Sequence, residues 1–261
     1  MAEIRVTSWI ELQDRLFTDM WRPDLKRFRS PYIFRGHSEA SYRLQTALCR
    51  LGGNFAELER HLLRNFRKYA HQDVVEQDTF WHWLSLAQHH GLPTRLLDWT
   101  TSPLVAAHFA TADHERFDTD GAIWAVNHIQ VHRLLPDQLR SQLTSERAEY
   151  FTVEMLSRAV DSLAALDALS PPNFVVFFEP PSMDDRIVNQ FALFSVMPDP
   201  QAALDEWLQD HPDVWHKIII PAELKWEVRD KLDQANITER VLFPGLDGLS
   251  KWQKRYYTPR S

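Results

Sequence analysis

The content of large aromatic side chains is the feature that most constrains how this chain folds. The chain has 10 Trp, 15 Phe and 6 Tyr, and so much aromatic surface cannot remain in water. Disorder is therefore excluded as the dominant state. The length of 261 residues corresponds to one large domain or two small ones. Because the sequence shows no repeat, low-complexity tract or linker, we expect a single domain over residues 1–261.

Charge and the length of apolar runs restrict the class of protein further. The chain has 29 Lys and Arg against 36 Asp and Glu, a formal charge of −7, which argues against a general nucleic-acid coat protein but allows a local basic cleft. No apolar run approaches the roughly 20 residues that span a bilayer, so we expect no membrane association. The first 20 residues have no apolar core typical of a signal peptide. With one cysteine, Cys49, we expect no internal disulfide and a cytoplasmic location.

Hydrophobic spacing and capping residues predict the secondary structure. Ser102 before Pro103 is a typical helix start, Gly91 a typical helix end, and Asp247 is expected to cap the last helix. Helices are predicted over residues 8–17, 55–69, 79–90, 103–113, 148–169, 223–234 and near the end, strands over 31–36, 121–127, 173–179, 187–197 and 215–221, and a structured loop over 92–102. Helices fill the first half and strands cluster later, which favours an α+β fold over a doubly wound sheet.

Three motifs together identify a family. They are FRGH at 34–37, LAQHHGLPTRLLDWTTSPLVAAHFA at 86–110 and LFPGLDGL at 242–249. The second is the most specific, because a match of that length and composition does not arise by chance. On these motifs the chain resembles the FRG domain family, which takes its name from a Phe-Arg-Gly motif. The resemblance extends over about residues 25–250.

The motif layout of this family is similar to that of ADP-ribosyltransferases, which cleave NAD at the nicotinamide–ribose bond. The resemblance implies an ADP-ribosyltransferase-like split sheet, mixed or antiparallel, with a helical insertion after the first strand. It implies an arginine on an early strand, hydroxyl side chains before a helix and a polar residue on a late strand. In this sequence these are Arg35, then Thr100, Thr101 and Ser102, and Gln190. NAD would be a substrate, and no metal is expected.

The chemistry of these residues fits that assignment. The fork of Arg35 suits the phosphate oxygens of NAD, and Gly36 would let a ligand approach the backbone. His37 and His89 are further candidates for contacting NAD. Cleavage of a glycosidic bond builds positive charge on the ribose, so side chains that hold the ribose hydroxyls lower the barrier by placement and electrostatics.

The catalytic carboxylate is where this sequence departs from the pattern. Many transferases of this type have a Glu at the third position, whereas this chain offers Gln190. Gln can hydrogen-bond a ribose hydroxyl but cannot act as a carboxylate. Glu179, at the end of the preceding predicted strand, is the alternative. We therefore take Arg35, Gln190 and Glu179 as the candidate catalytic residues.

Each candidate also has a purely structural interpretation. Arg35 could pair with Asp98 and hold two loops together, and the hydroxyls of residues 100–102 could cap the following helix. Arg95 would satisfy loop carbonyls while Trp99 fills the core. The basic aromatic tail over residues 251–257 could bind nucleic acid by stacking and phosphate pairing or pack its rings onto the body.

Three functions remain open at this point. The first is an NAD-dependent ADP-ribosyltransferase, a bacterial toxin or anti-phage defence effector with a protein or nucleic-acid acceptor and an inhibitory partner protein. The second is a non-enzymatic module that binds a nucleotide or a partner. The third is a nuclease that uses His37, His89 or His90 as a base. A metal site is not expected, because the histidines lack a zinc-site spacing and cysteine ligands.

Overall fold

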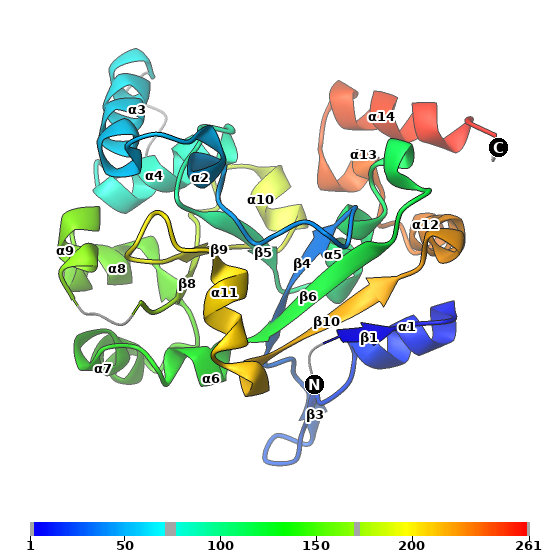
Figure 1. Ribbon diagram of the computed structural model, residues 1–261, viewed down its shortest axis with the longest axis horizontal. Helices are drawn as coiled ribbons and strands as arrows, with labels where there is room; N and C mark the ends of the chain where they lie inside the picture. Colours follow the sequence, from blue (N-terminus) through cyan, green and yellow to red (C-terminus); the bar gives the residue numbers. More distant parts are fainter. Residues whose placement is uncertain (1–2, 71–76, 170–172, 260–261) are drawn as a thin grey trace.

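The computed structural model describes residues 3–70, 77–169 and 173–259. Within them the chain forms one eight-stranded mixed sheet with helices on both faces and a separate two-stranded ribbon (Figure 1). The order across the sheet is β1-β10-β6-β4-β5-β9-β8-β7. The strands are β1 (Glu3–Arg5), β4 (Tyr32–His37), β5 (Leu97–Thr100), β6 (Gly121–Asn127), β7 (Phe151–Thr152), β8 (Val176–Glu179), β9 (Ala192–Val196) and β10 (Trp215–Ile220). This architecture confirms the predicted α+β class.

The sheet is almost divided in two between β4 and β5. These strands pair at a single position, Phe34 with Thr100. By contrast, β4 pairs with β6 along its full length, and β5 pairs with β9 along its full length. The result is two four-stranded halves joined at one residue pair. The predicted split of a mixed sheet is therefore present, and most of its pairs are antiparallel, with the parallel pairs β1–β10 and β7–β8 at the two outer edges.

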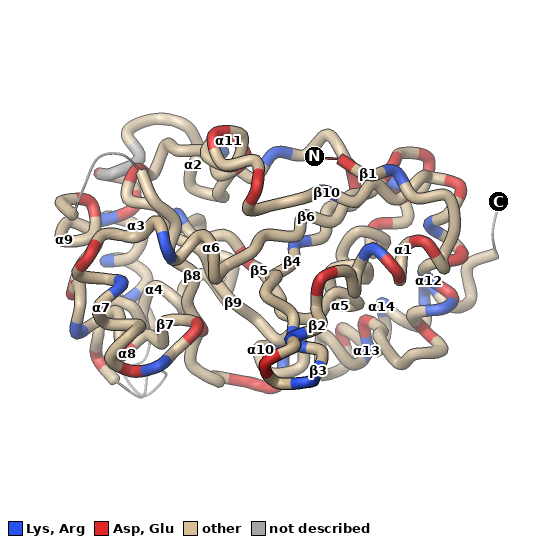
Figure 2. The backbone as a smooth tube through the Cα atoms, turned by 90° about the horizontal axis from the view of Figure 1, so that it is seen from below, with Lys and Arg blue, Asp and Glu red and all other residues tan. Residues whose placement is uncertain are grey.

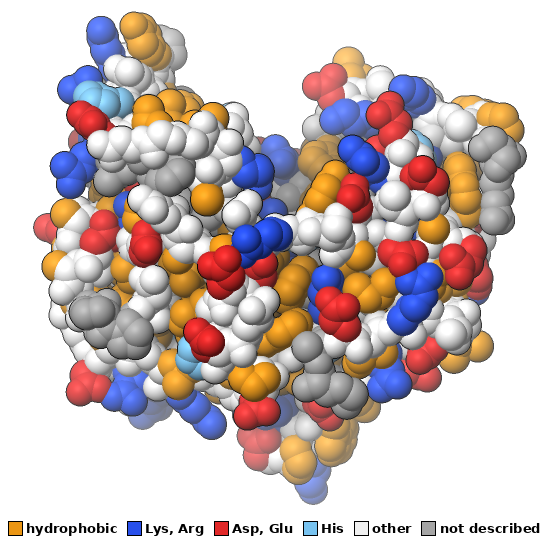
Figure 3. All heavy atoms as spheres, viewed as in Figure 1, with side chains coloured by type: hydrophobic (Ala, Val, Ile, Leu, Met, Phe, Trp, Pro, Cys, Tyr) orange, Lys and Arg blue, Asp and Glu red, His pale blue; other side chains and the backbone are white. Residues whose placement is uncertain are grey.

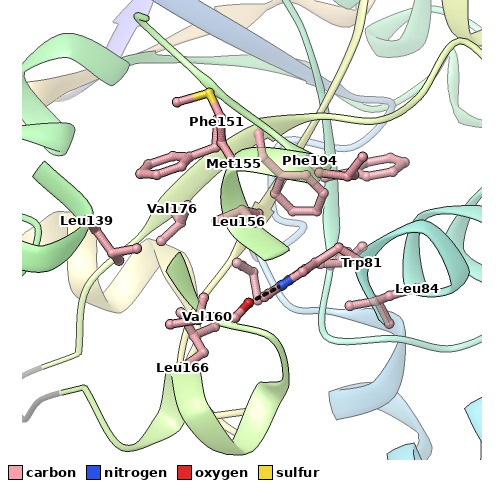
Figure 4. Packing of buried hydrophobic residues seen from close by; sticks show 14 of the residues in the cluster. Trp81, Leu84, Leu139, Phe151, Met155, Leu156, Val160, Leu166, Val176 and Phe194 are labelled. Atoms are coloured by element: carbon pink, nitrogen blue, oxygen red, sulfur yellow. Dashed lines mark hydrogen bonds between the residues drawn. The ribbon is translucent and has the colours of Figure 1, made fainter. Parts of the chain in front are cut away.

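Different helices cover the two halves on one face of the sheet. The half formed by β1, β10, β6 and β4 packs against α1 (Trp9–Leu16), α5 (Pro103–Ala110) and α12 (Lys225–Gln234). The other half packs against α4 (Phe80–His89), α7 (Asp137–Glu146), α8 (Val153–Ala159) and α9 (Leu163–Asp167). Figure 4 shows this second core, where Trp81 donates its indole N–H to the Val160 carbonyl at 2.6 Å. Each half therefore has its own core on this face.

The opposite face of the sheet is continuous across the split. Its core includes Ile33 and Trp124 from one half and Trp99 and Phe177 from the other. Two short helices cover it, α6 (His128–His132) and α11 (Leu204–Gln209). Trp99 fills this core as predicted and donates to the Ser195 hydroxyl at 2.9 Å. This shared core holds the two halves together behind the split.

The remaining elements are short or peripheral. The helices are α2 (Ala47–Leu51), α3 (Phe55–Tyr69), α10 (Asp185–Asn189), α13 (Glu239–Leu242) and α14 (Leu246–Tyr256), the 3-10 turns are His114–Arg116, Pro212–Val214 and Ala222–Leu224, and the ribbon is β2 (Trp21–Arg22) with β3 (Arg27–Phe28). The backbone trace in Figure 2 places α2 and α11 at one side of the sheet and α10 and α13 at the other. Among the described residues, no helix has the length and apolar character needed to cross a membrane.

Several predicted elements are confirmed and several are wrong. The helices over 8–17, 55–69, 79–90 and 103–113 and the strands over 31–36, 121–127 and 215–221 are present within a few residues. The predicted loop over 92–102 is wrong, because Leu97–Thr100 forms β5 inside the sheet. The predicted single helix over 148–169 is wrong, because it divides into β7, α8 and α9.

The predicted strand over 187–197 begins too early. Its first residues belong to α10, Phe191 adopts a left-handed conformation with φ 49°, and β9 begins only at Ala192. The helical insertion α2 to α4 does precede β5, but it follows the fourth strand of the chain rather than the first. The N-cap of α14 is Gly245, so the assignment of Asp247 as the cap is also wrong.

Candidate functional site

A pocket of about 580 Å³ opens where β4 and β5 separate. Its walls come from both halves of the sheet, from the end of α4 and from α10, and Figure 3 shows the molecule notched on this side, between the parts that carry α2 and α13. The described side chains that line it include Phe34, Arg35, Gly36, Gln88, His89, His90, Asp98, Thr100, Phe109, Arg186, Gln190 and Phe194. The split in the sheet therefore makes a concave site of the size that small-molecule ligands occupy.

Arg35 bridges the two halves of the sheet at the pocket. Its Nη1 donates to the carbonyl oxygen of Asp98 at 2.5 Å and lies 3.7 Å from Oδ2 of the same residue. The Asp98 carbonyl lies beyond the last residue pair of the β4–β5 ladder, so a side chain satisfies it in place of a strand. The pairing with Asp98 expected from the sequence is confirmed. One fifth of the Arg35 side chain remains exposed, so the guanidinium also faces the pocket.

His37 orients Arg35 and does not line the pocket. Its Nε2 accepts a hydrogen bond from Arg35 Nε at 3.0 Å, which requires an unprotonated ring nitrogen. Burial, together with the charge of Arg35, lowers the pKa of His37 to about 3. The ring is therefore neutral near pH 7. Since Nε2 is occupied by Arg35, His37 is poorly suited to be the base of a nuclease.

Gly36 is required by helix packing. A Cβ atom built at this position would lie 2.0 Å from the Ala106 carbonyl oxygen and 2.7 Å from the Ala110 nitrogen, both in α5. We expected the glycine to admit a ligand to the backbone, and it does line the pocket. The contact that demands glycine is nevertheless the close approach of α5 to β4.

Asp98 is a pocket carboxylate held in place by a buried relay. Both of its carboxylate oxygens accept from Gln88 Nε2 at 3.1 Å. The Gln88 amide is itself oriented, because its Oε1 accepts from the buried Thr94 hydroxyl at 2.5 Å. The Asp98 side chain is 61% exposed, so its charge is available to a ligand. From the sequence we considered Asp98 only as an ion-pair partner; the alternation of apolar Leu97 and Trp99 with polar Asp98 and Thr100 was the signal that this segment is a strand with one polar face.

The hydroxyl residues 100–102 have structural roles. Thr100 Oγ1 donates to the Gln190 carbonyl at 2.7 Å and accepts from the Ser102 amide. Ser102 caps α5, with its hydroxyl accepting from the Val105 amide at 3.4 Å. Thr101 donates its backbone N–H to the Phe191 carbonyl. Of the three, Thr100 alone lines the pocket, so the capping interpretation accounts for Ser102.

The two other predicted catalytic residues are placed differently from each other. Gln190 lines the pocket, but it is the C-cap of α10 rather than part of a strand. Its side-chain nitrogen donates to the Leu242 carbonyl at 2.8 Å, which ties α10 to the third motif. Glu179 ends β8 and does not line the pocket.

Arg186 is a pocket residue that the sequence motifs did not indicate. Its guanidinium lies 5.1 Å from the centre of the Phe243 ring, and Nη1 donates to the His89 carbonyl at 3.4 Å. Its Nε is buried and has no hydrogen-bond partner among the described residues. No carboxylate of the described chain forms an ion pair with Arg186, so its charge is open to an anionic ligand. The sequence around it is rich in Asp and gives no hint of this role.

His89 lies at the same end of the pocket. Its Nε2 is 2.7 Å from Asp184 Oδ2, and the other carboxylate oxygen of Asp184 accepts from the Ile187 amide at the start of α10. The histidine is thus oriented by a carboxylate, an arrangement that suits proton transfer as well as simple support. Among the described residues, no group of three or more His, Cys, Asp or Glu side chains is arranged to hold a metal ion.

The residues of the pocket define the ligands it can hold. Two guanidinium groups, Arg35 and Arg186, face one carboxylate, Asp98, and three phenylalanines supply apolar wall. Guanidinium forks bind phosphate and carboxylate oxygens in pairs. The pocket is therefore suited to a molecule with an anionic group, ring systems and hydroxyls.

Comparison with known families agrees with the motifs. Residues 30–119 match the family model of the FRG domain. The chain contains an FRG domain. The matched FRG residues extend from just before β4 to just before β6 and include Arg35, Gln88 and Asp98, whereas Arg186 and Gln190 follow them in the chain. No curated protein and no solved structure shows significant similarity. A single domain over residues 1–261 remains a prediction.

Proposed function

We propose that the pocket binds NAD and that the protein is an NAD-dependent ADP-ribosyltransferase. The observation that carries this proposal is the combination of two guanidiniums and one positioned carboxylate in a pocket of about 580 Å³ at a split in the sheet. In this proposal Arg35 and Arg186 hold the diphosphate, and the phenylalanine walls contact the rings. The family resemblance is what selects NAD among molecules of this chemistry.

The reaction breaks the bond between ribose C1′ and the nicotinamide nitrogen. Nicotinamide leaves with the bonding electron pair, and an acceptor nucleophile or water forms the new bond to C1′ and releases a proton. Positive charge develops on the ribose as the bond breaks. A carboxylate already fixed beside the sugar stabilises that charge without further reorganisation. We assign this role to Asp98, because Gln190 is neutral and hydrogen-bonded to Leu242 and Glu179 lies outside the pocket lining.

Arg186 provides the sharper test of NAD binding. Arg35 holds the two sheet halves together through Asp98, so its removal also disturbs the fold. Arg186 makes one long hydrogen bond and one ring contact. We expect Arg186→Ala to raise the Kd for NAD by about 10-fold or more, since charge-assisted hydrogen bonds contribute about 1.5–3 kcal/mol. The measurement is calorimetric titration with NAD.

The same proteins are then assayed for nicotinamide release with protein, RNA and DNA acceptors. Asp98→Asn should lower kcat by about 100-fold while the Kd for NAD changes little, as expected when a group acts mainly on the transition state. Arg43→Ala is the control, because Arg43 is an ion-paired arginine outside the pocket. The proposal fails if the wild-type protein neither binds NAD nor releases nicotinamide.

A non-enzymatic nucleotide-binding module is the second candidate. The observation in its favour is that the amide of Gln190 is already bonded to Leu242, while the only carboxylate that lines the pocket in the described chain is also close to Arg35. Binding of NAD that depends on Arg186, without release of nicotinamide by any acceptor, would favour this function. Degradation of RNA without NAD, lost in His89→Ala, would instead favour the nuclease.

A further inference from the structure

The two-stranded ribbon projects from the body of the molecule. We call residues 20–29 the hairpin 20–29: β2 and β3 pair antiparallel, with Trp21 opposite Phe28 and Arg22 opposite Arg27. The Arg29 amide closes its base on the Met20 carbonyl at 2.6 Å, and Met20 is buried. In Figure 1 the hairpin extends below the N-terminus, at the opposite end of the molecule from α2 and α10, which contribute to the pocket wall. It is an anchored arm with an exposed tip.

The hairpin exposes large apolar side chains. Trp21, Leu25 and Phe28 are 49%, 53% and 65% exposed. The Trp21 and Phe28 rings meet edge to face, with centroids 5.1 Å apart. Pairing with each other fixes the two rings but leaves much of their surface in water. Clusters of exposed apolar side chains on a soluble protein mark surfaces that bind something.

The hairpin is also strongly basic within an acidic chain. Residues 20–29 contain Arg22, Lys26, Arg27 and Arg29 against Asp24, a net charge of 4 − 1 = +3 where the whole chain carries −7. Arg22 lies 3.4 Å from Asp24, and no carboxylate of the described residues pairs with Lys26, Arg27 or Arg29. Arg22 and Arg27 stand directly opposite each other across the strands, and like charges in that position destabilise a ribbon. An anionic ligand would relieve this repulsion.

The combination favours one class of ligand. Three of the four cations are arginines, which pair with phosphate oxygens bidentately, and exposed aromatic rings offer faces on which bases stack. We propose that the hairpin 20–29 is a docking arm for single-stranded nucleic acid. Phosphates contact the arginine side of the ribbon, and bases stack on Trp21 and Phe28. This inference is independent of the proposed NAD chemistry.

The test measures binding of a fluorescently labelled oligouridylate and oligothymidylate by anisotropy, at low and at physiological salt. The variant Arg27→Gln/Phe28→Ala removes one cation and one ring from the arm. The matched control is Lys68→Gln/Tyr69→Ala, which removes an adjacent exposed cation and ring at the end of α3. Because all four side chains are exposed, both variants should keep the circular dichroism spectrum and the Tm of the wild type.

We expect wild-type protein and control to bind with Kd values within about 2-fold of each other. The hairpin variant should bind about 10-fold or more weakly, since each stacked base contributes about 1–3 kcal/mol, and its dependence on salt should be shallower by about 0.7 in log–log slope per lost phosphate contact. Absence of oligonucleotide binding by the wild type overturns the proposal. Equal loss in the control, or hairpin-dependent binding to phosphatidylserine vesicles without binding to oligonucleotides, overturns it as well.

Discussion

Arg95 offers the clearest test of what the long motif does for the fold. Its guanidinium is almost fully buried and contacts Glu59 at 2.7 Å, Asp167 at 2.6 Å and the Pro198 carbonyl at 2.6 Å. It thereby connects α3, α9 and the segment after β9. The architectural role that the sequence suggests for Arg95 is confirmed by these contacts. We predict that Arg95→Met destabilises the protein severely although Met fills much of the same volume.

The magnitude follows from the burial of the partner. Glu59 is also almost fully buried, and removing one member of a buried ion pair costs about 3–5 kcal/mol because the other charge is left without compensation. At about 2–4 °C per kcal/mol for a chain of this size, the Tm should fall by about 6–20 °C. The control is Arg43→Met, whose partners Asp205 and Glu206 form an ion-pair group with a half-exposed arginine. There we expect a loss of about 1 kcal/mol or less.

The pH dependence adds a second, independent measurement. Burial raises the pKa of Glu59 even with Arg95 beside it, and without Arg95 it will rise further. A carboxyl whose pKa is raised on folding binds its proton more tightly in the folded state, so folding gains free energy as the pH falls. The free energy of unfolding of Arg95→Met, from urea titrations followed by circular dichroism, should therefore approach that of the wild type between pH 7.5 and 5.5. A loss below about 1 kcal/mol at pH 7.5, or a gap that widens as the pH falls, refutes this reasoning.

Three further predictions concern the pocket wall, a helix cap and the buried histidines. Gly36→Ala should abolish stable folding or lower the Tm by more than 10 °C, on the order of several kcal/mol, because the new Cβ would overlap α5 backbone; a Tm near that of the wild type would contradict the packing. Ser102→Ala should cost about 1 kcal/mol in urea titrations with NAD affinity unchanged, whereas loss of affinity would show that the hydroxyl contacts the ligand. Burial lowers the pKa of His37, His108 and His128 to about 3 and of His132 to about 4, so stability should be complete above about pH 6.5 and fall below it by about 1.4 kcal/mol per pH unit and histidine; stability independent of pH between 6.5 and 4.5 would contradict neutral burial.

The sequence predicts the helices well where capping and period agree. Thr79, Ser102 and Ser8 accept the expected amide hydrogen bonds at the starts of α4, α5 and α1. Gly91, just beyond α4, has the expected left-handed φ of 80°. Local side-chain chemistry alone determines such ends. These positions could therefore be predicted without knowledge of the tertiary structure.

The missed elements depend on contacts distant in sequence. Four residues, Leu97–Thr100, form a strand because β9 pairs with them along their whole length, and no local period of that length is distinctive. The helix predicted over 148–169 is interrupted where Phe151 pairs with Phe178 of β8. Arg186 reaches the pocket through the path of α10, which the sequence assigns to a strand. For the same reason Gln190 was expected on a strand and lies instead at the end of a helix.

The division of the sheet also decides where the molecule keeps its unpaired strand edges. An ordinary open sheet presents its unsatisfied amides and carbonyls at two outer strands, where a second chain can add to them and start aggregation. Here the outer strands β1 and β7 have only three and two residues. The free edges of β4 and β5 instead face each other inside the pocket, with a helix at each side. A small ligand can use these backbone groups, while a neighbouring polypeptide has little edge left on which to build.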